Sequence, residues 1–141
     1  MNVEVVRQVP VILLPYIDPW LIQEPSLLDL EIVANMQAQM DESTAHLLRH
    51  EYVYAFVIRD SPWRAQLHLF SLGGPRTVQS FKAITQYALT LYHRLEGRFQ
   101  NRKIAALAKR CGWHHEATYK NSFRLKDGGF IDEYGVAICR E

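Results

Sequence analysis

The stretch that decides the fold is Leu95–Ile138, which reads LEGRFQNRKIAALAKRCGWHHEATYKNSFRLKDGGFIDEYGVAI. Its first five residues indicate a short strand. Asn101 follows at a position typical of a helix N-cap, because an asparagine side-chain oxygen accepts an early helical N–H. Apolar residues then recur at helical spacing as far as Cys111, and Gly112 is a natural left-handed stop. The pattern predicts a strand, a capped helix and a glycine stop in direct succession.

Two further strand-like runs follow Trp113, separated by Asp127-Gly128-Gly129. Asp-Gly is a strong hairpin signal, because tight hairpin turns need backbone conformations that glycine adopts without strain. We therefore expect the chain to end in an antiparallel hairpin.

Strands and helices also alternate upstream of this block, beginning with residues 3–6 and 11–14, which indicate one strand interrupted at Pro10 or two short strands. A helix is expected from a capping box at Ser26 toward Met40, and Asp41–Ser43 breaks or re-caps it before residues 45–48, which are counted with the helix. Residues 51–59 are apolar on both faces, which indicates a central strand covered on both sides. A second strand over 65–72 and a helix from about residue 78 to 92 follow. Its buried face is expected to comprise Phe81, Ile84, Ala88 and Leu91.

The element order is then β, α, β, β, α, β, α, β, β, which predicts an α/β (α+β) fold with helices on both faces of a mixed central sheet. A length of 141 residues suits one domain, residues 1–141. The hydrophobic content of 48% is ample for a folded core.

Composition also limits the function. A net charge of +1 gives no signal for nucleic acid, and no apolar run is long enough to cross a bilayer. Two cysteines, Cys111 and Cys139, do not form a disulfide framework, so a reduced, cytoplasmic location is expected. Cys111, His114, His115 and Cys139 are zinc-ligand types, but they lack a second tight pair, and no metal is expected.

The C-terminal block resembles the GNAT family of N-acetyltransferases, in which an Asn, a helix, Gly-aromatic, Glu-small and a hairpin follow in this order. The matching residues are Asn101, Gly112-Trp113, Glu116-Ala117, Gly129, Asp132 and Tyr134. The block is most similar to GNAT-like proteins encoded by bacteriophages. The resemblance is close over this block, loose over the middle of the chain, and absent from the N-terminal third. It implies a GNAT-like sheet, acetyl-CoA as the acetyl donor and an amine as the acceptor.

The resemblance also implies where acetyl-CoA would bind. Its pyrophosphate would lie on the loop between a central strand and the next helix, where free N–H groups and the helix dipole attract phosphates. The implied cofactor-binding residues are Leu69, Phe70, Leu72, Gly73, Gly74, Arg76, Thr77 and Val78, with Asn101 at the pantetheine arm. The family's Gly-x-Gly after a basic residue is absent here, since both glycines precede Arg76. A simple strand-ending turn is the alternative interpretation of this loop.

Catalytic residues are less well marked. Glu51 and His68 are candidate general bases, because a carboxylate or an imidazole can take a proton from an ammonium group. The alternative is that Glu51 is a solvated strand end and His68 a cross-strand neighbour. The position of the family's usual general-acid tyrosine holds Ala108.

Two hypotheses follow from the sequence. In the first, the protein is an N-acyltransferase that acetylates an amine substrate in a gap between two parallel strands. In the second, it is a catalytically degenerate GNAT-like protein that binds a protein partner, such as other virion proteins, in the host cytoplasm or in the virion.

Overall fold

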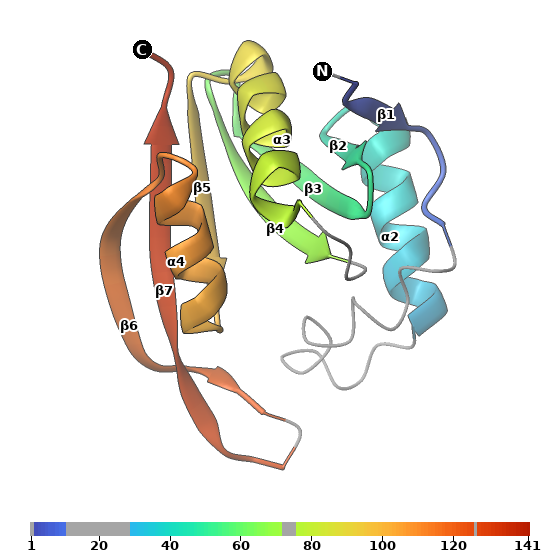
Figure 1. Ribbon diagram of the computed structural model, residues 1–141. Helices are drawn as coiled ribbons and strands as arrows, with labels where there is room; N and C mark the ends of the chain where they lie inside the picture. Colours follow the sequence, from blue (N-terminus) through green and yellow to red (C-terminus); the bar gives the residue numbers. More distant parts are fainter. Residues whose placement is uncertain (1, 11–28, 72–75, 126) are drawn as a thin grey trace.

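The computed structural model describes residues 2–10, 29–71, 76–125 and 127–141. Within these residues, seven strands form one sheet in the order β1-β2-β3-β4-β5-β7-β6, with three helices packed against it (Figure 1). The elements are β1 (Glu4–Val6), α2 (Asp29–Asp41), β2 (Ala45–His50), β3 (Val53–Ser61), β4 (Arg64–Ser71), α3 (Thr77–Leu91), β5 (Arg94–Phe99), α4 (Arg102–Arg110), β6 (His114–Arg124) and β7 (Phe130–Cys139). This is the mixed sheet, with helices on both faces, that the sequence predicts.

The join between β4 and β5 organises the sheet. All other neighbouring strands are antiparallel, whereas β4 and β5 are parallel and are connected by α3, as a parallel pair requires. Their pairing extends only from Arg64↔Arg94 to Gln66↔Glu96, although β4 continues to Ser71 and β5 to Phe99. Below this short contact the two strands diverge (Figure 1).

The two faces of the sheet are covered by different helices. Alternate residues of β3 divide between two cores: Val53 and Val57 pack with α3, and Phe56 packs with Met36 of α2. Figure 1 shows α3 and α4 side by side over one face. The prediction that β3 is buried on both sides is therefore confirmed.

The decisive C-terminal block is built as its sequence predicts. Asn101 caps α4 by accepting a hydrogen bond from the backbone N–H of Lys103 at 2.8 Å. The helix ends at Arg110, and Gly112, just beyond the C-cap Cys111, has a φ of 95°. The backbone N–H of Trp113 then donates to the carbonyl of Ala108 at 3.0 Å. In the hairpin turn, Gly128 has a φ of 89°.

Three predictions are wrong. Residues 45–48 belong to strand β2, because α2 ends at Asp41 and the fully buried Leu47 and Leu48 pair with β3. Glu51 lies in the β2–β3 turn with a φ of 54°, so β3 begins only at Val53. Leu91, expected on the buried face of α3, is 40% exposed at the end of that helix.

Residues 11–14 and the capping box at Ser26 lie outside the described residues. Among the described helices, none is long and apolar enough to cross a membrane.

Candidate active site

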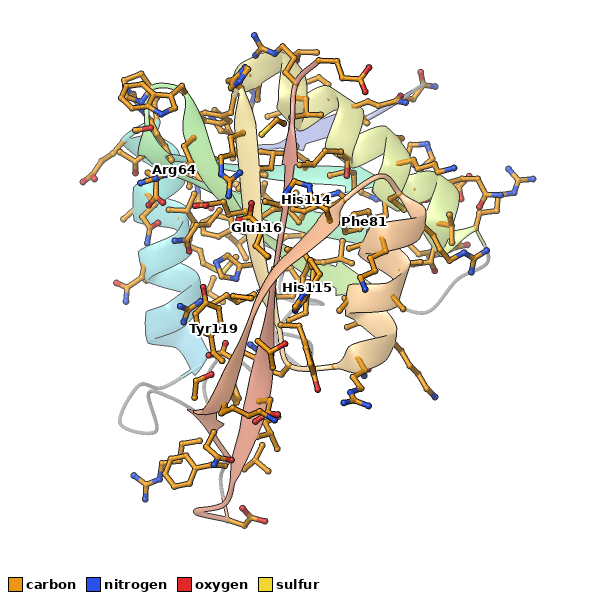
Figure 2. The ribbon with its side chains drawn as sticks, turned by 90° about the vertical axis from the view of Figure 1, so that its left-hand side faces the viewer. Arg64, Phe81, His114, His115, Glu116 and Tyr119 are labelled. Carbon is orange, nitrogen blue, oxygen red and sulfur yellow. The ribbon has the colours of Figure 1, made fainter. Side chains whose placement is uncertain are left out.

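A cavity of about 330 Å³ lies where β4 and β5 diverge. Four neighbouring strands and Gln100, which follows β5, line the cavity. The strand residues are Gln66, Leu67 and His68 of β4; Glu96, Gly97 and Arg98 of β5; Glu116, Tyr119 and Phe123 of β6; and Glu133, Gly135 and Val136 of β7. Figure 2 shows Tyr119 and Arg64 on the side of the sheet that carries α2, and His115 and Phe81 on the side of α3 and α4. The polar wall of the cavity thus faces away from the core under α3.

Two glycines of the cavity lining lie on opposite faces of the sheet, Gly135 on the polar face with Arg98 and Gly97 on the core face with Phe99. A Cβ atom on Gly135 would stand 3.1 Å from Cε2 of Tyr119, so the tyrosine ring lies directly against the bare backbone of β7. A Cβ atom on Gly97 would stand 3.2 Å from Cζ of Phe99 and 3.5 Å from the carbonyl oxygen of Leu67. A side chain at either position would therefore require the ring of Tyr119 or of Phe99 to move by a few tenths of an ångström.

Arg98 lies over the face of Tyr119, with its Cζ atom 3.9 Å from the ring centroid. A guanidinium on an aromatic face is attracted by the ring quadrupole. Its Nη1 atom is 3.8 Å from Oε1 of Glu133, and the Arg98 side chain is 54% exposed. The register explains this grouping, because Arg98 pairs directly with Gly135 and Tyr119 with Glu133.

Glu133 is a buried carboxylate, with the whole residue only 4% exposed. Its Oε2 atom accepts a hydrogen bond from Gln100 Nε2 at 2.9 Å, and its Oε1 atom accepts one from Ser122 Oγ at 2.8 Å. A buried charge is tolerated only when it is hydrogen-bonded or paired. These two donors and the nearby Arg98 supply that compensation.

The other two carboxylates of the cavity are paired with arginines. Arg94 donates to Glu96 at 3.1 Å and also to Glu116, and Arg64 lies 3.6 Å from Glu96. The hydrogen bond from Arg94, followed by the one from His114, lowers the pKa of Glu116, and the same contact raises the pKa of Arg94. Most of these groups are partly solvated, so the network stabilises the fold only modestly.

His68 lies on the β4 side of the cavity. Burial lowers the pKa of its imidazole from 6.5 to about 4, because the charged form loses its hydration. His68 is therefore neutral at neutral pH. A neutral imidazole can accept a proton, but at this pKa it is a weak base.

The candidate catalytic and cofactor-binding residues that the sequence indicates lie at several separate places in the structure. Of the two candidate bases, His68 lines the cavity, while Glu51 lies in the β2–β3 turn, 3.7 Å from Arg76. The described candidates for cofactor binding lie in three places. On β4, Leu69 packs toward the α3 core and Phe70 toward α2. Arg76 is the N-cap residue of α3, which begins with Thr77 and Val78, and Asn101 caps α4. Leu72, Gly73 and Gly74 lie outside the described residues.

Sequence reasoning missed Arg98, Gln100 and Glu133 as cavity residues. A signal was present in β5, where Arg94, Glu96 and Arg98 alternate with apolar or small residues. Such alternation predicts a polar sheet face. The alternation in β5 does not indicate which strands lie beside β5 in the sheet. No group of three His, Cys, Asp or Glu residues suited to a metal ion occurs in the described part of the chain.

Among the described residues, the mixed seven-stranded sheet with its three helices matches the fold of solved GNAT acetyltransferases. The sequence matches no protein-family model and no curated protein. Solved structures do match. A spermidine N-acetyltransferase from Vibrio cholerae, solved with CoA and spermine, has a TM-score of 0.73 at 13% identity over 97% of this chain and 95% of its own.

Two further structures support the same fold. A ribosomal-protein-alanine N-acetyltransferase from Brucella melitensis has a TM-score of 0.68 at 16% identity, over 99% of this chain and 100% of its own. A GNAT-family acetyltransferase from Streptococcus pneumoniae has a TM-score of 0.60 at 16% identity, over 81% of this chain and 78% of its own. The similarity to these acetyltransferases is in the fold.

Proposed function

We propose that this protein is an acyl-CoA-dependent N-acyltransferase that transfers the acetyl group of acetyl-CoA to the amine of an acceptor. The observation that supports it most is the opening between β4 and β5, which leads into a cavity walled by polar side chains. An acetyl donor placed in this opening would present its thioester to an acceptor in the cavity. Catalysis of this kind depends mainly on positioning the two reactants.

The start of α3 suits the phosphates of CoA. Arg76 has a φ of 64° and is followed by the helical Thr77, and this left-handed to right-handed sequence turns successive N–H groups toward one point. The Arg76 side chain makes no capping hydrogen bond, and the first turn of α3 has no acidic residue. A phosphate there would interact with the N–H groups, the helix dipole and the largely exposed Arg76 side chain.

The remaining contacts follow from the strands. Past Gln66, the edge of β4 that faces β5 has no strand partner among the described residues. Its backbone N–H groups could polarise the thioester carbonyl, as preorganised donors do in acyl transfer. Asn101 uses Oδ1 for its cap, which leaves the side-chain N–H groups for the pantetheine arm.

Calorimetry of the protein with acetyl-CoA and with CoA tests the proposal, and we expect micromolar binding. The variant Thr77→Glu should abolish it, because a carboxylate would stand where a phosphate docks. An acidic residue in the first turn of a helix favours folding, so lost binding would not reflect unfolding. Gln86→Glu adds the same charge to the middle of α3 as the matched control. Equal acetyl-CoA binding by both variants would refute this docking site.

A second candidate function is that of a GNAT-like module without catalysis, which binds a protein partner. One observation favours it: Ala108, at the position of the usual general acid, is fully buried and carries no hydroxyl. A bacteriophage origin, a place in the virion and a cytoplasmic location belong with this candidate as predictions. Binding of acetyl-CoA without release of CoA thiol toward any amine tested would favour it over the enzyme.

A further inference from the structure

The most unusual pair in the cavity is Arg98 and Glu133. Arg94, on the same strand, donates hydrogen bonds to Glu96, Glu116 and Cys139. The Arg98 side chain donates no hydrogen bond to any residue in the described part of the chain, and its one ion-pair contact, to Glu133, is 3.8 Å long. The guanidinium of Arg98 therefore keeps its N–H groups available on the wall of a cavity.

The position of Arg98 is nevertheless well defined. Its guanidinium lies on the ring of Tyr119, which in turn lies against Gly135. Stacking uses the face of the guanidinium and leaves its N–H groups, which point outward in its plane, for an acceptor. A planar fork of this kind matches a carboxylate, which it can bind through two parallel hydrogen bonds.

Glu133 offers the complementary charge beside it. A carboxylate has about four acceptor positions, and Gln100 and Ser122 occupy two of those on Glu133. The remaining positions can accept hydrogen bonds from an ammonium group. The wall thus presents a carboxylate receptor and an ammonium receptor next to each other.

The charge balance of the cavity selects among acceptors. Glu96 and Glu116 are already paired with Arg94, and His68 is neutral at neutral pH. Arg98 and Glu133 face each other only across a long ion pair of 3.8 Å, so one positive and one negative group can each also contact a ligand. This pair favours a zwitterion over a polycation, which would need several unpaired carboxylates. A volume of about 330 Å³ suits a small molecule.

The geometry points to a free α-amino acid as the acceptor, with its carboxylate on Arg98 and its ammonium group on Glu133; this rests on the proposed transfer reaction. Glu133 accepts one proton from the ammonium. The nitrogen lone pair then forms the new C–N bond while the thioester C–S bond breaks and its electron pair leaves with sulfur. The second nitrogen proton reaches the thiolate through water, which gives an N-acetyl amino acid and CoA.

The test is thiol release from acetyl-CoA with each of the twenty amino acids. The best substrate is then compared with its amide, which keeps the amine and lacks the carboxylate. We expect the amide to have a kcat/KM at least tenfold lower. Arg98→Gln should raise KM for the amino acid roughly 10- to 100-fold, the size expected for losing charge-assisted hydrogen bonds, and should leave the amide unaffected.

Further variants separate binding from folding. Arg98→Lys keeps the charge without the fork and should recover only part of the affinity. Glu133→Gln keeps the size of the side chain and should lower kcat for acid and amide alike. Arg124→Gln, at an exposed position at the end of β6, is the matched control. Should Glu133→Gln fail to fold, the Arg98 variants decide the matter, because that side chain is 54% exposed.

Two results would overturn the inference: no amino acid is bound or acetylated, or Arg98→Gln affects acid and amide equally. Protein-detected NMR titration with the amino acids, without acetyl-CoA, measures occupation of the cavity by itself. Amino-acid binding without acetyl-CoA binding would contradict the proposed function alone. Acetyl-CoA binding without any amino-acid binding would contradict the acceptor alone.

Discussion

Because the pKa of His68 is lowered in the folded protein, the free energy of unfolding should decrease as the pH falls. The pKa is about 4 in the folded protein against an ordinary value of 6.5. Below pH 6.5 the unfolded chain binds a proton that the folded protein does not take up, so stability falls as the pH falls from 6.5 toward 4. Above pH 6.5 both states are neutral and the effect vanishes.

The size of the effect follows from these two values. At pH 5 the unfolded imidazole is almost fully protonated and the folded one almost fully neutral. The linkage relation then gives a loss of roughly 2 kcal/mol in the free energy of unfolding relative to pH 7.5. Because His68 is only half-buried and lines a cavity that water can enter, this value is an upper limit.

Urea unfolding at pH 7.5 and pH 5.0 measures this loss in the wild-type protein and in His68→Gln. The wild type should lose up to about 2 kcal/mol more than the variant. His46, whose pKa is also lowered by burial, is present in both proteins and cancels in the difference. His93→Gln serves as the reference for removing an exposed imidazole. Equal pH dependence of the wild type and His68→Gln, within the error of the extrapolation, would refute the reasoning.

Three further substitutions test the C-terminal block by thermal and urea unfolding. Asn101→Ala removes the acceptor for the N–H of Lys103 and should lower the free energy of unfolding by about 1 kcal/mol; an unchanged midpoint would contradict the capping role. Gly112→Ala places a side chain at a φ of 95° and should destabilise by roughly 1–2 kcal/mol; an unchanged free energy of unfolding would contradict the left-handed stop. Trp113→Phe leaves the buried hydroxyl of Thr85 without the indole N–H at 3.1 Å and should cost about 1–3 kcal/mol; a double variant with Thr85→Val should recover part of that loss.

Local signals account for what was predicted well. The cap at Asn101, the stop at Gly112 and the turn at Gly128 each depend on one residue and its immediate backbone, so the sequence alone indicates them. Residues 45–48 show the opposite case. Ala, His and Leu are compatible with a helix, and only pairing with β1 and β3 makes this segment a strand.

The candidate site depended on tertiary structure for a different reason. The sequence could indicate that β5 has a polar face, and its resemblance to GNAT proteins indicated a gap between two strands. It could not indicate that the face of β5 lies beside Glu133 and Tyr119, because strand β7 comes between β5 and β6 only once the hairpin has folded back.

The amino-acid sequence by itself determined the capped helix, the hairpin and the two-sided central strand, since these follow from turn chemistry and from the spacing of apolar residues. The tertiary structure alone decided that Arg98 stacks on Tyr119 beside a buried Glu133. The physical reason is register: pairing between strands distant in sequence sets which side chains share a face. No local preference encodes that pairing.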